Sequence, residues 1–469
     1  MKKNNEYFCL IILILSISLG LLFCYQLEPD YFWHIKAGEY MFHHGILTHD
    51  IFSWSVFHQY WMSHEWLFEI ILYILRSLFG NIHVLIYTGF LSSILLIICF
   101  LPNWKNVSKN LYYGLFYLLF FFMIFAPFIQ ARPHMISFVL FALSVWFLYD
   151  YYQNKESHKI WFLPLLSIIW ANVHGGSSNL PYLLCFLFGI SGMFSFQMKK
   201  IEAKRITKKQ IKTYFIIMFL CMIAVCINPH FFRMFLYPYQ NMMDTTMLQN
   251  IREWQGTSLN VFYHYIYYAF LLFMIGTFLF SSKKIQFVDL FLFAFSAYLG
   301  LKSIRFWIFG PVIMSFIIFP YVCSKKMVSA KVVVSTLGVF VGLIFLFQFK
   351  NYLPIVYRFY LTEDIYTVLE KEKPNRLFNM YDFGGELVYH DIPVFIDGRA
   401  DLYSSHNYRD YLDISYLKNN APSLMQKYDF DYYLVSDEYP IYTYLHSQDE
   451  YKDIYHHEHI WLYKKNSNS

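Results

Sequence analysis

Long apolar runs constrain the fold of this chain more than any other feature. Backbone N–H and C=O groups inside a bilayer must be bonded within their own segment, so such runs cross it as helices. About 17 to 20 residues span roughly 30 Å of hydrocarbon. Of the 469 residues, 57% are hydrophobic and only 15% are charged, which excludes an ordinary soluble domain. We predict a polytopic α-helical membrane protein with eleven spans, at residues 8–25, 83–101, 111–131, 135–151, 160–174, 181–197, 213–229, 262–280, 285–300, 305–323 and 331–349.

Basic residues predict the orientation of these helices, because lysine and arginine gather in the cytoplasmic loops. Every second loop is rich in them: Lys2, Lys3, Lys105, Lys109, Lys155, Lys159, the block at 199–212, Lys283, Lys284, Lys325, Lys326 and Lys331. The alternate loops are poorer: Lys36, Arg76, Arg132, Arg233, Arg252, Lys302 and Arg305. This alternation predicts a multi-pass protein of the cell membrane with its N-terminus inside and its tail outside.

The apolar segment 66–80 is not counted as a span. It is short and carries Glu69 and Arg76. A span here would also reverse the sidedness of every later loop. We predict an amphipathic helix that lies in the outer interface.

Ionisable residues are concentrated in the loop that follows the first apolar run. In a chain otherwise poor in acids and imidazoles, such groups set among tryptophans indicate a polar pocket at the membrane surface. We therefore predict that this loop carries the active site. The candidates are Asp30, His34, Asp50, His64 and Glu65.

Three further candidates lie in loops that return to the same predicted face. Arg132 in QARPH and Arg305 in LKSIRFW could bind a phosphate through a bidentate guanidinium, although such side chains also extend routinely to the interface. His174 in ANVHGG stands beside glycines that let a backbone approach a ligand. A tight turn with a solvated histidine is the alternative. The outward loops thus predict a composite extracytoplasmic site.

From about residue 350 the composition becomes that of ordinary mixed sequence. We predict a membrane domain at 1–350 with a large first outer loop at 26–82, and a small extracytoplasmic α/β domain at 351–469. In the tail, RLFNMY, PVFIDGR and FDYYLVSD are typical of strands, GGELVYH and PIYTYLHSQ of helices, and YKDIYHHEHIWLYKK of a strand pair. Asp397, Arg399 and Asp401 are predicted to form a structural turn or an acceptor-binding edge.

Nine segments extend over nearly the whole chain: PDYFWHIKAGEY, THDIFSW, WMSHEWLFE, ARPHMISF, WANVHGG, NPHFFRMFLYP, IREWQ, FNMYDFGGELVY and PVFIDGRADLY. In these segments the chain resembles the GT-C superfamily of membrane glycosyltransferases, and more closely a widespread set of bacterial membrane proteins of that type. The resemblance implies transfer of a sugar from a polyprenyl-phosphate carrier to a surface glycan, lipid or protein outside the membrane. Asp30 holds the position of the superfamily's first-loop acid, and so of the base, although an adjacent acidic pair is replaced here by Pro29-Asp30.

The resemblance gives the other candidates supporting roles. His34, Arg132 and Arg305 would hold a phosphate or orient the base, and Asp50, His64, Glu65 and His174 would help to bind substrate. Asp30 could instead cap the helix that follows it. No cofactor is firmly implied, but Asp30, Asp50, His64 and Glu65 could together bind a divalent metal, although their spacing is not diagnostic.

The alternative function is that of a non-enzymatic membrane protein for the transport or assembly of surface polysaccharide. A transporter predicts ionisable residues near helix centres. Here they cluster at one predicted face, which favours the enzyme. The basic block at 199–212 is interpreted as an orientation signal in contact with the lipid bilayer, and not as a nucleic-acid site.

Overall fold

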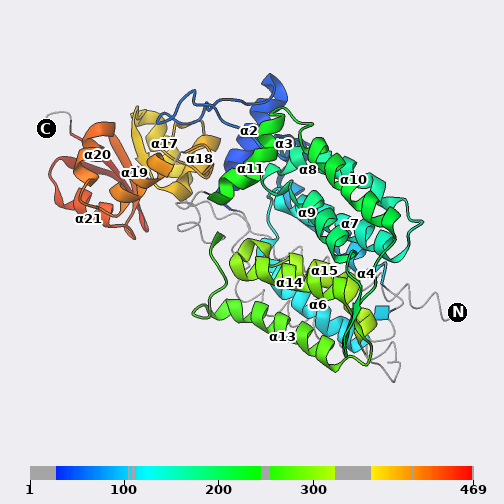
Figure 1. Ribbon diagram of the computed structural model, residues 1–469. Coiled ribbons are helices and arrows are strands. Elements are labelled where there is room, and N and C mark those ends of the chain that lie inside the picture. Colours follow the sequence, from blue (N-terminus) through cyan, green and yellow to red (C-terminus); the bar gives the residue numbers. More distant parts are fainter. Residues whose placement is uncertain are drawn as a thin grey trace. The chain divides into compact units, whose positions relative to one another are not determined.

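A computed structural model describes residues 28–103, 106–107, 111–243, 254–322, 361–403 and 405–466 (Figure 1). These residues fall into two compact units. The helical unit comprises 79–243 and 254–322, and the loop–tail unit comprises 28–78, 361–403 and 405–466. The predicted spans at 8–25 and 331–349 lie outside the described residues.

The helical unit is built from apolar helices joined by short turns and 3-10 segments. Helices α7, α8, α9 and α10 pack together, while α14 and α15 pack on one another, and α15 also contacts α4 and α7 (Figure 1). The α-helices are α4 (His83–Phe100), α6 (Leu111–Phe125), α7 (His134–Gln153), α8 (Leu163–Val173), α9 (Leu180–Ser191), α10 (Lys208–Val225), α11 (Phe232–Met243), α13 (Tyr265–Phe280), α14 (Phe287–Lys302) and α15 (Phe309–Ile317).

Three helical stretches among the described residues are long and apolar enough to cross a membrane, judged by length and composition. They are Trp66–Phe100, His134–Gln153 and Phe262–Phe280. The prediction of a mostly helical chain with membrane-length helices is confirmed. The count of eleven spans is not, because turns interrupt several of the apolar runs: α8 ends before the turn at 174–177, and α15 has only nine residues between two 3-10 segments.

Segment 66–80 forms helix α3 (Trp66–Phe79), which continues through a 3-10 turn (Gly80–Ile82) into α4. Gly80 has φ +55, a conformation that a residue without Cβ adopts at no steric cost. The division between the units falls at this point. Helix α3 buries Phe68 and Leu72 but leaves Leu78 69% exposed, the one-sided burial of an amphipathic helix.

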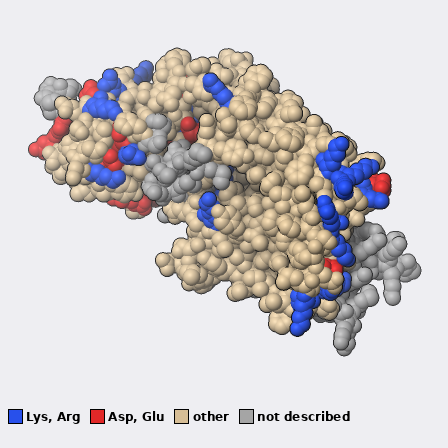
Figure 2. Space-filling model, in the orientation of Figure 1, with Lys and Arg blue, Asp and Glu red and all other residues tan. Residues whose placement is uncertain are grey.

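Three lysine-rich loops in the described part of the helical unit meet at one end of its helices. A small sheet joins two of them, with β1 (Phe196–Gln197) antiparallel to β2 (Ile201–Ala203) and β2 parallel to β3 (Ile285–Gln286). The Gln210 side chain also donates to the Tyr151 carbonyl at 3.0 Å, which attaches the start of α10 to the end of α7. Figure 2 shows the resulting concentration of Lys and Arg along one edge, where Lys and Arg of 199–212 are exposed.

In the loop–tail unit, a four-stranded sheet has the order β4-β5-β7-β6. Strands β4 and β5 are parallel, and β5–β7 and β7–β6 are antiparallel. The predicted small α/β region is therefore present, with strands and helices close to several of the expected segments. The elements are α2 (Asp30–His44), α3, α17 (Glu363–Glu372), β4 (Leu377–Asn379), α18 (Gly384–Tyr389), α19 (Ser405–Ser415), α20 (Ala421–Tyr428), β5 (Tyr432–Ser436), α21 (Pro440–Ser447), β6 (Tyr451–His457) and β7 (Ile460–Lys465).

The segment PVFIDGR is not a strand of this sheet, which corrects the prediction. It runs instead beside the first loop, where Trp54 N–H donates to the Val394 carbonyl at 3.0 Å and Val394 N–H to the Phe52 carbonyl at 3.2 Å. The Asn379 side chain holds the next two residues, accepting from Phe395 N at 2.8 Å and donating to the Ile396 carbonyl at 2.7 Å. These bonds replace those of a sheet neighbour.

The domain boundary also differs from the sequence-based division. Residues 28–78 belong to the same unit as the tail and not to the helical unit. One hydrophobic core contains Trp33, Met41 and Trp61 from the first loop together with Phe378 and Leu434 from the tail. The first loop and the tail therefore fold as one unit, because each supplies part of a shared core.

Candidate functional site

Helix α2 carries His34 into the interior of the loop–tail unit. Gly38 allows α2 to lie directly against α3, since a Cβ at this position would be 2.1 Å from the Glu69 carbonyl oxygen. The close approach places His34, only 1% exposed, between two glutamates at the start of α3. Glu65 and Glu69 share one helix face because they are four residues apart.

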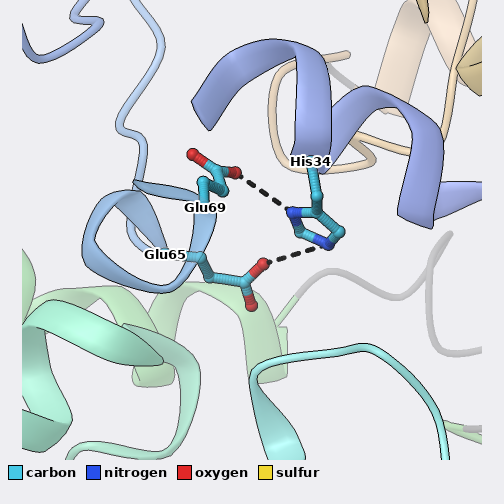
Figure 3. A group of neighbouring side chains, drawn as sticks. All are labelled: His34, Glu65 and Glu69. Carbon is cyan, nitrogen blue, oxygen red and sulfur yellow. Dashed lines mark hydrogen bonds and ion pairs between the residues drawn. The ribbon is translucent and has the colours of Figure 1, made fainter. Parts of the chain in front are cut away.

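The imidazole of His34 lies between these two carboxylates (Figure 3). Its Nδ1 is 3.1 Å from Glu69 Oε1, a hydrogen bond, while its Nε2 is 3.7 Å from Glu65 Oε2. The second oxygen of Glu69 accepts from Ser63 Oγ at 3.1 Å. One ligand atom from each of His34, Glu65 and Glu69 lies within 4.8 Å of the others, so the three form a candidate metal-binding group.

The series of alternating acids and imidazoles continues from Glu65 to the tail. His64 Nε2 is 3.2 Å from Glu65 Oε1, and its Nδ1 is 3.3 Å from Asp401 Oδ2. Burial alone would lower the pKa of His64, but the carboxylates of Glu65 and Asp401 outweigh burial and raise that pKa to about 10. One acid from the loop and one from the tail therefore favour the protonated imidazole of His64.

Asp30 lies at the first position of α2 and makes no side-chain cap; Pro29 holds the cap position. Its Oδ1 accepts from Trp33 Nε1 at 3.2 Å. The same oxygen rests against the Cα of Gly398, where a Cβ would come within 1.7 Å of it. The turn that contains Gly398 also contains Asp401, so a single tail turn contacts both Asp30 and His64.

Asp50 is fully buried and serves a structural network. Its Oδ2 accepts from Ser53 N at 3.0 Å, and its Oδ1 accepts from Arg399 Nη1 at 2.6 Å. Arg399 also donates to both oxygens of Asp397, at 2.9 and 2.6 Å, and Tyr403 donates to the second of these at 2.9 Å. The buried ion pairs account for Asp50 and for the predicted structural turn at 397–401. A substrate-binding role for Asp50 stays a prediction.

In the helical unit, His174 and Arg305 come together although they are far apart in sequence. Arg305 Nη2 is 3.1 Å from His174 Nε2. Because a guanidinium only donates, Nε2 must accept, which puts the ring proton on Nδ1. His174 Nδ1–H then donates to Ser137 Oγ at 2.7 Å and to Ser177 Oγ at 3.0 Å. The Arg305 guanidinium also lies over the Trp254 ring at 5.0 Å.

Arg132 lies just before α7, where its carbonyl accepts from the Tyr87 hydroxyl at 2.8 Å. The phosphate-binding roles predicted for Arg132, His174 and Arg305 stay predictions for the helical unit. The structure joins the second and third of these residues by a hydrogen bond.

Sequence reasoning missed three members of the cluster in the loop–tail unit: Ser63, Glu69 and, as a partner of His64, Asp401. The signal for Glu69 was present, since its spacing of four from Glu65 predicts one shared helix face. No local pattern reveals Asp401, which reaches His64 from the tail.

The chain matches no protein-family model. A search of curated proteins also returns no similar sequence. Functional inference therefore depends on the geometry of the two polar clusters.

Proposed function

We propose that this protein is a membrane glycosyltransferase of the GT-C type that moves a sugar from a polyprenyl-phosphate carrier to a surface glycan, lipid or protein. One observation carries the proposal. In the loop–tail unit, the ionisable residues of the first loop, singled out from sequence as an active site, lie around one tail turn: Asp30 beside Gly398 and His64 on Asp401. Residues gathered from separate segments into one place are typical of catalytic sites.

In the proposed reaction Asp30 is the general base. It takes the proton of the acceptor hydroxyl as the oxygen attacks the anomeric carbon of the sugar. The bond between that carbon and the phosphate oxygen breaks, polyprenyl phosphate leaves, and the configuration at the carbon inverts. The Trp33 indole N–H, bonded to Asp30, fixes the direction of the carboxylate.

The proposal also includes the orientation of the chain in the membrane. Two observations support the proposed topology: apolar helices make up much of the described part of the predicted spans, and the described lysine-rich loops gather at one end of the helical unit. We infer a multi-pass protein with that end in the cytoplasm and the loop–tail unit outside, where a lipid-linked sugar and a surface acceptor are found.

The test compares Asp30→Asn with wild type in a strain that lacks the gene. Asn keeps the shape of the side chain but cannot take the proton, so we expect the surface sugar lost in the deletion strain to be restored by wild type only. Asp391→Asn is the matched control, because Asp391 is 76% exposed in the same unit and pairs with Lys36. Equal amounts of each protein in the membrane are confirmed by immunoblot, and surface glycans are compared by composition.

Two results would contradict the proposal. Full complementation by Asp30→Asn would show that Asp30 is not the base. Unchanged surface glycans in the deletion strain would show that the protein is not the transferase, and would favour a transport or assembly protein.

A further inference from the structure

We propose that His34, Glu65 and Glu69 bind a divalent transition-metal ion, of the class of Zn²⁺ or Mn²⁺. The site goes beyond the transferase reaction described above, which routes no step through a metal. One imidazole and two carboxylates are ligands that zinc and manganese accept in proteins.

Nε2 of His34 gives the first independent indication of a ligand. The side chain is 1% exposed, and its Nδ1 is engaged by Glu69 at 3.1 Å. Within the described part of the chain, Nε2 faces Glu65 Oε2 at 3.7 Å, too far for a hydrogen bond. Two ligand atoms on one tetrahedral zinc ion lie about 3.3 Å apart, since each bond is about 2.0–2.1 Å. The 3.7 Å separation of Nε2 and Oε2 is thus closer to the spacing of two ligands that share an ion than to the length of a hydrogen bond.

Charge is the second indication. Glu65 and Glu69 bring two carboxyl groups to one buried imidazole, and a carboxylate that is buried without a compensating cation is costly. His64, the neighbouring imidazole, lies between the other oxygen of Glu65 and a further acid, Asp401. A divalent ion would offset the negative charge of the two proposed carboxylate ligands.

The supporting contacts resemble those that orient metal ligands. Ser63 Oγ donates to Glu69 Oε2 at 3.1 Å, and His64 holds Glu65 Oε1 at 3.2 Å, so each carboxylate is fixed from outside the group. Such outer contacts set the direction of ligands in metal sites. One ligand atom from each residue lies within 4.8 Å of the others, and Glu69 would exchange its bond to His34 Nδ1 for a bond to the ion.

Metal content of the purified full chain tests the site without any assay of sugar transfer. The protein in detergent is exposed to ZnCl₂ or MnCl₂, dialysed against metal-free buffer and measured by mass spectrometry of the elements. Wild type should keep about one ion per chain, and His34→Gln and Glu69→Gln should bind at least about tenfold more weakly. The matched control is Glu39→Gln. Glu39 lies on the same helix as His34, with its side chain 45% exposed, so this variant should bind metal as tightly as wild type.

A second measurement covers variants that fail to fold. Wild type stripped with a chelator should gain thermal stability on addition of Zn²⁺ or Mn²⁺, with a midpoint that rises with metal concentration, and should not gain it with Mg²⁺. The proposal is overturned if wild type retains no metal and shows no such gain, or if folded His34→Gln binds metal as tightly as wild type. Neither result bears on Asp30 as the base.

Discussion

Asp30 shows how one glycine can set the position of a side chain. Its Oδ1 occupies the space that a Cβ would fill at Gly398 and accepts a hydrogen bond from the Trp33 indole N–H. The sequence indicates Asp30 as a candidate base, but the glycine that fixes its place lies in a distant segment. Catalysis is sensitive to such placement, because misplacement by 1 Å can cost about 100-fold in rate.

We therefore expect Gly398→Ala to reduce sugar transfer by about 100-fold with little loss of stability. The new methyl group would come within 1.7 Å of Asp30 Oδ1 and 3.0 Å of Trp33 Nε1, so the carboxylate has to rotate away; none of its three nearest atoms belongs to the backbone. The measurement is the amount of surface sugar restored in the deletion strain, together with the thermal midpoint of the purified protein. Gly276→Ala is the control, since a Cβ there meets nothing within 4 Å. Unchanged transfer by Gly398→Ala would show that the position of Asp30 does not matter.

At the scale of elements, the segment 392–403 is the connection between the first loop and the tail sheet. Its backbone pairs with Phe52 and Trp54 on one side, and Asn379 at the end of β4 holds it on the other. Arg399 then joins Asp50 and Asp397 in a network with side chains 0% exposed. Removing one partner of a buried ion pair leaves the other charge uncompensated, which costs about 3–5 kcal/mol.

For this reason Arg399→Met is expected to lower the thermal midpoint of the purified protein by roughly 10 °C. It leaves two carboxylates buried without their cation. Arg376→Met is the matched control: Arg376 also pairs with an aspartate, but its side chain is 51% exposed, and exposed pairs contribute little. A midpoint for Arg399→Met equal to that of the control would mean that the network does not hold the two segments together. Circular dichroism at low temperature confirms that each variant begins folded.

At the scale of the whole molecule, basic loops that alternate with less basic ones along the chain also lie together in space in the helical unit. The loops at 196–203 and 285–286 are joined by β-pairing, and Gln210 attaches a third at Tyr151. His174 and Arg305 are joined by their own hydrogen bond, in loops that lack the lysine block. The pattern of charge read along the chain is thus also a pattern in space.

Labelling by a membrane-impermeant maleimide tests the proposed orientation in intact cells. We expect Lys418→Cys, in the tail, to be labelled and Lys204→Cys, in the basic block, to be labelled only after the membrane is opened. Both lysines are exposed, at 56% and 74%. The unsubstituted chain, with its seven cysteines, sets the background. The proposed orientation would be wrong if Lys204→Cys is labelled in intact cells and Lys418→Cys is not.

Sequence alone determined the helical, membrane-length character of the chain, the basic loops, much of the tail sheet and the first loop as a candidate site. These features depend on local composition and periodicity, which the apolar runs and the Glu65–Glu69 spacing display directly. Only tertiary structure decided that the first loop and the tail form one unit, that PVFIDGR pairs with the loop, that Asp50 is bound by Arg399, and that Asp401 holds His64. The physical reason is that these contacts join residues more than 300 positions apart, and the packing of a shared core, which no local pattern encodes, brings them together.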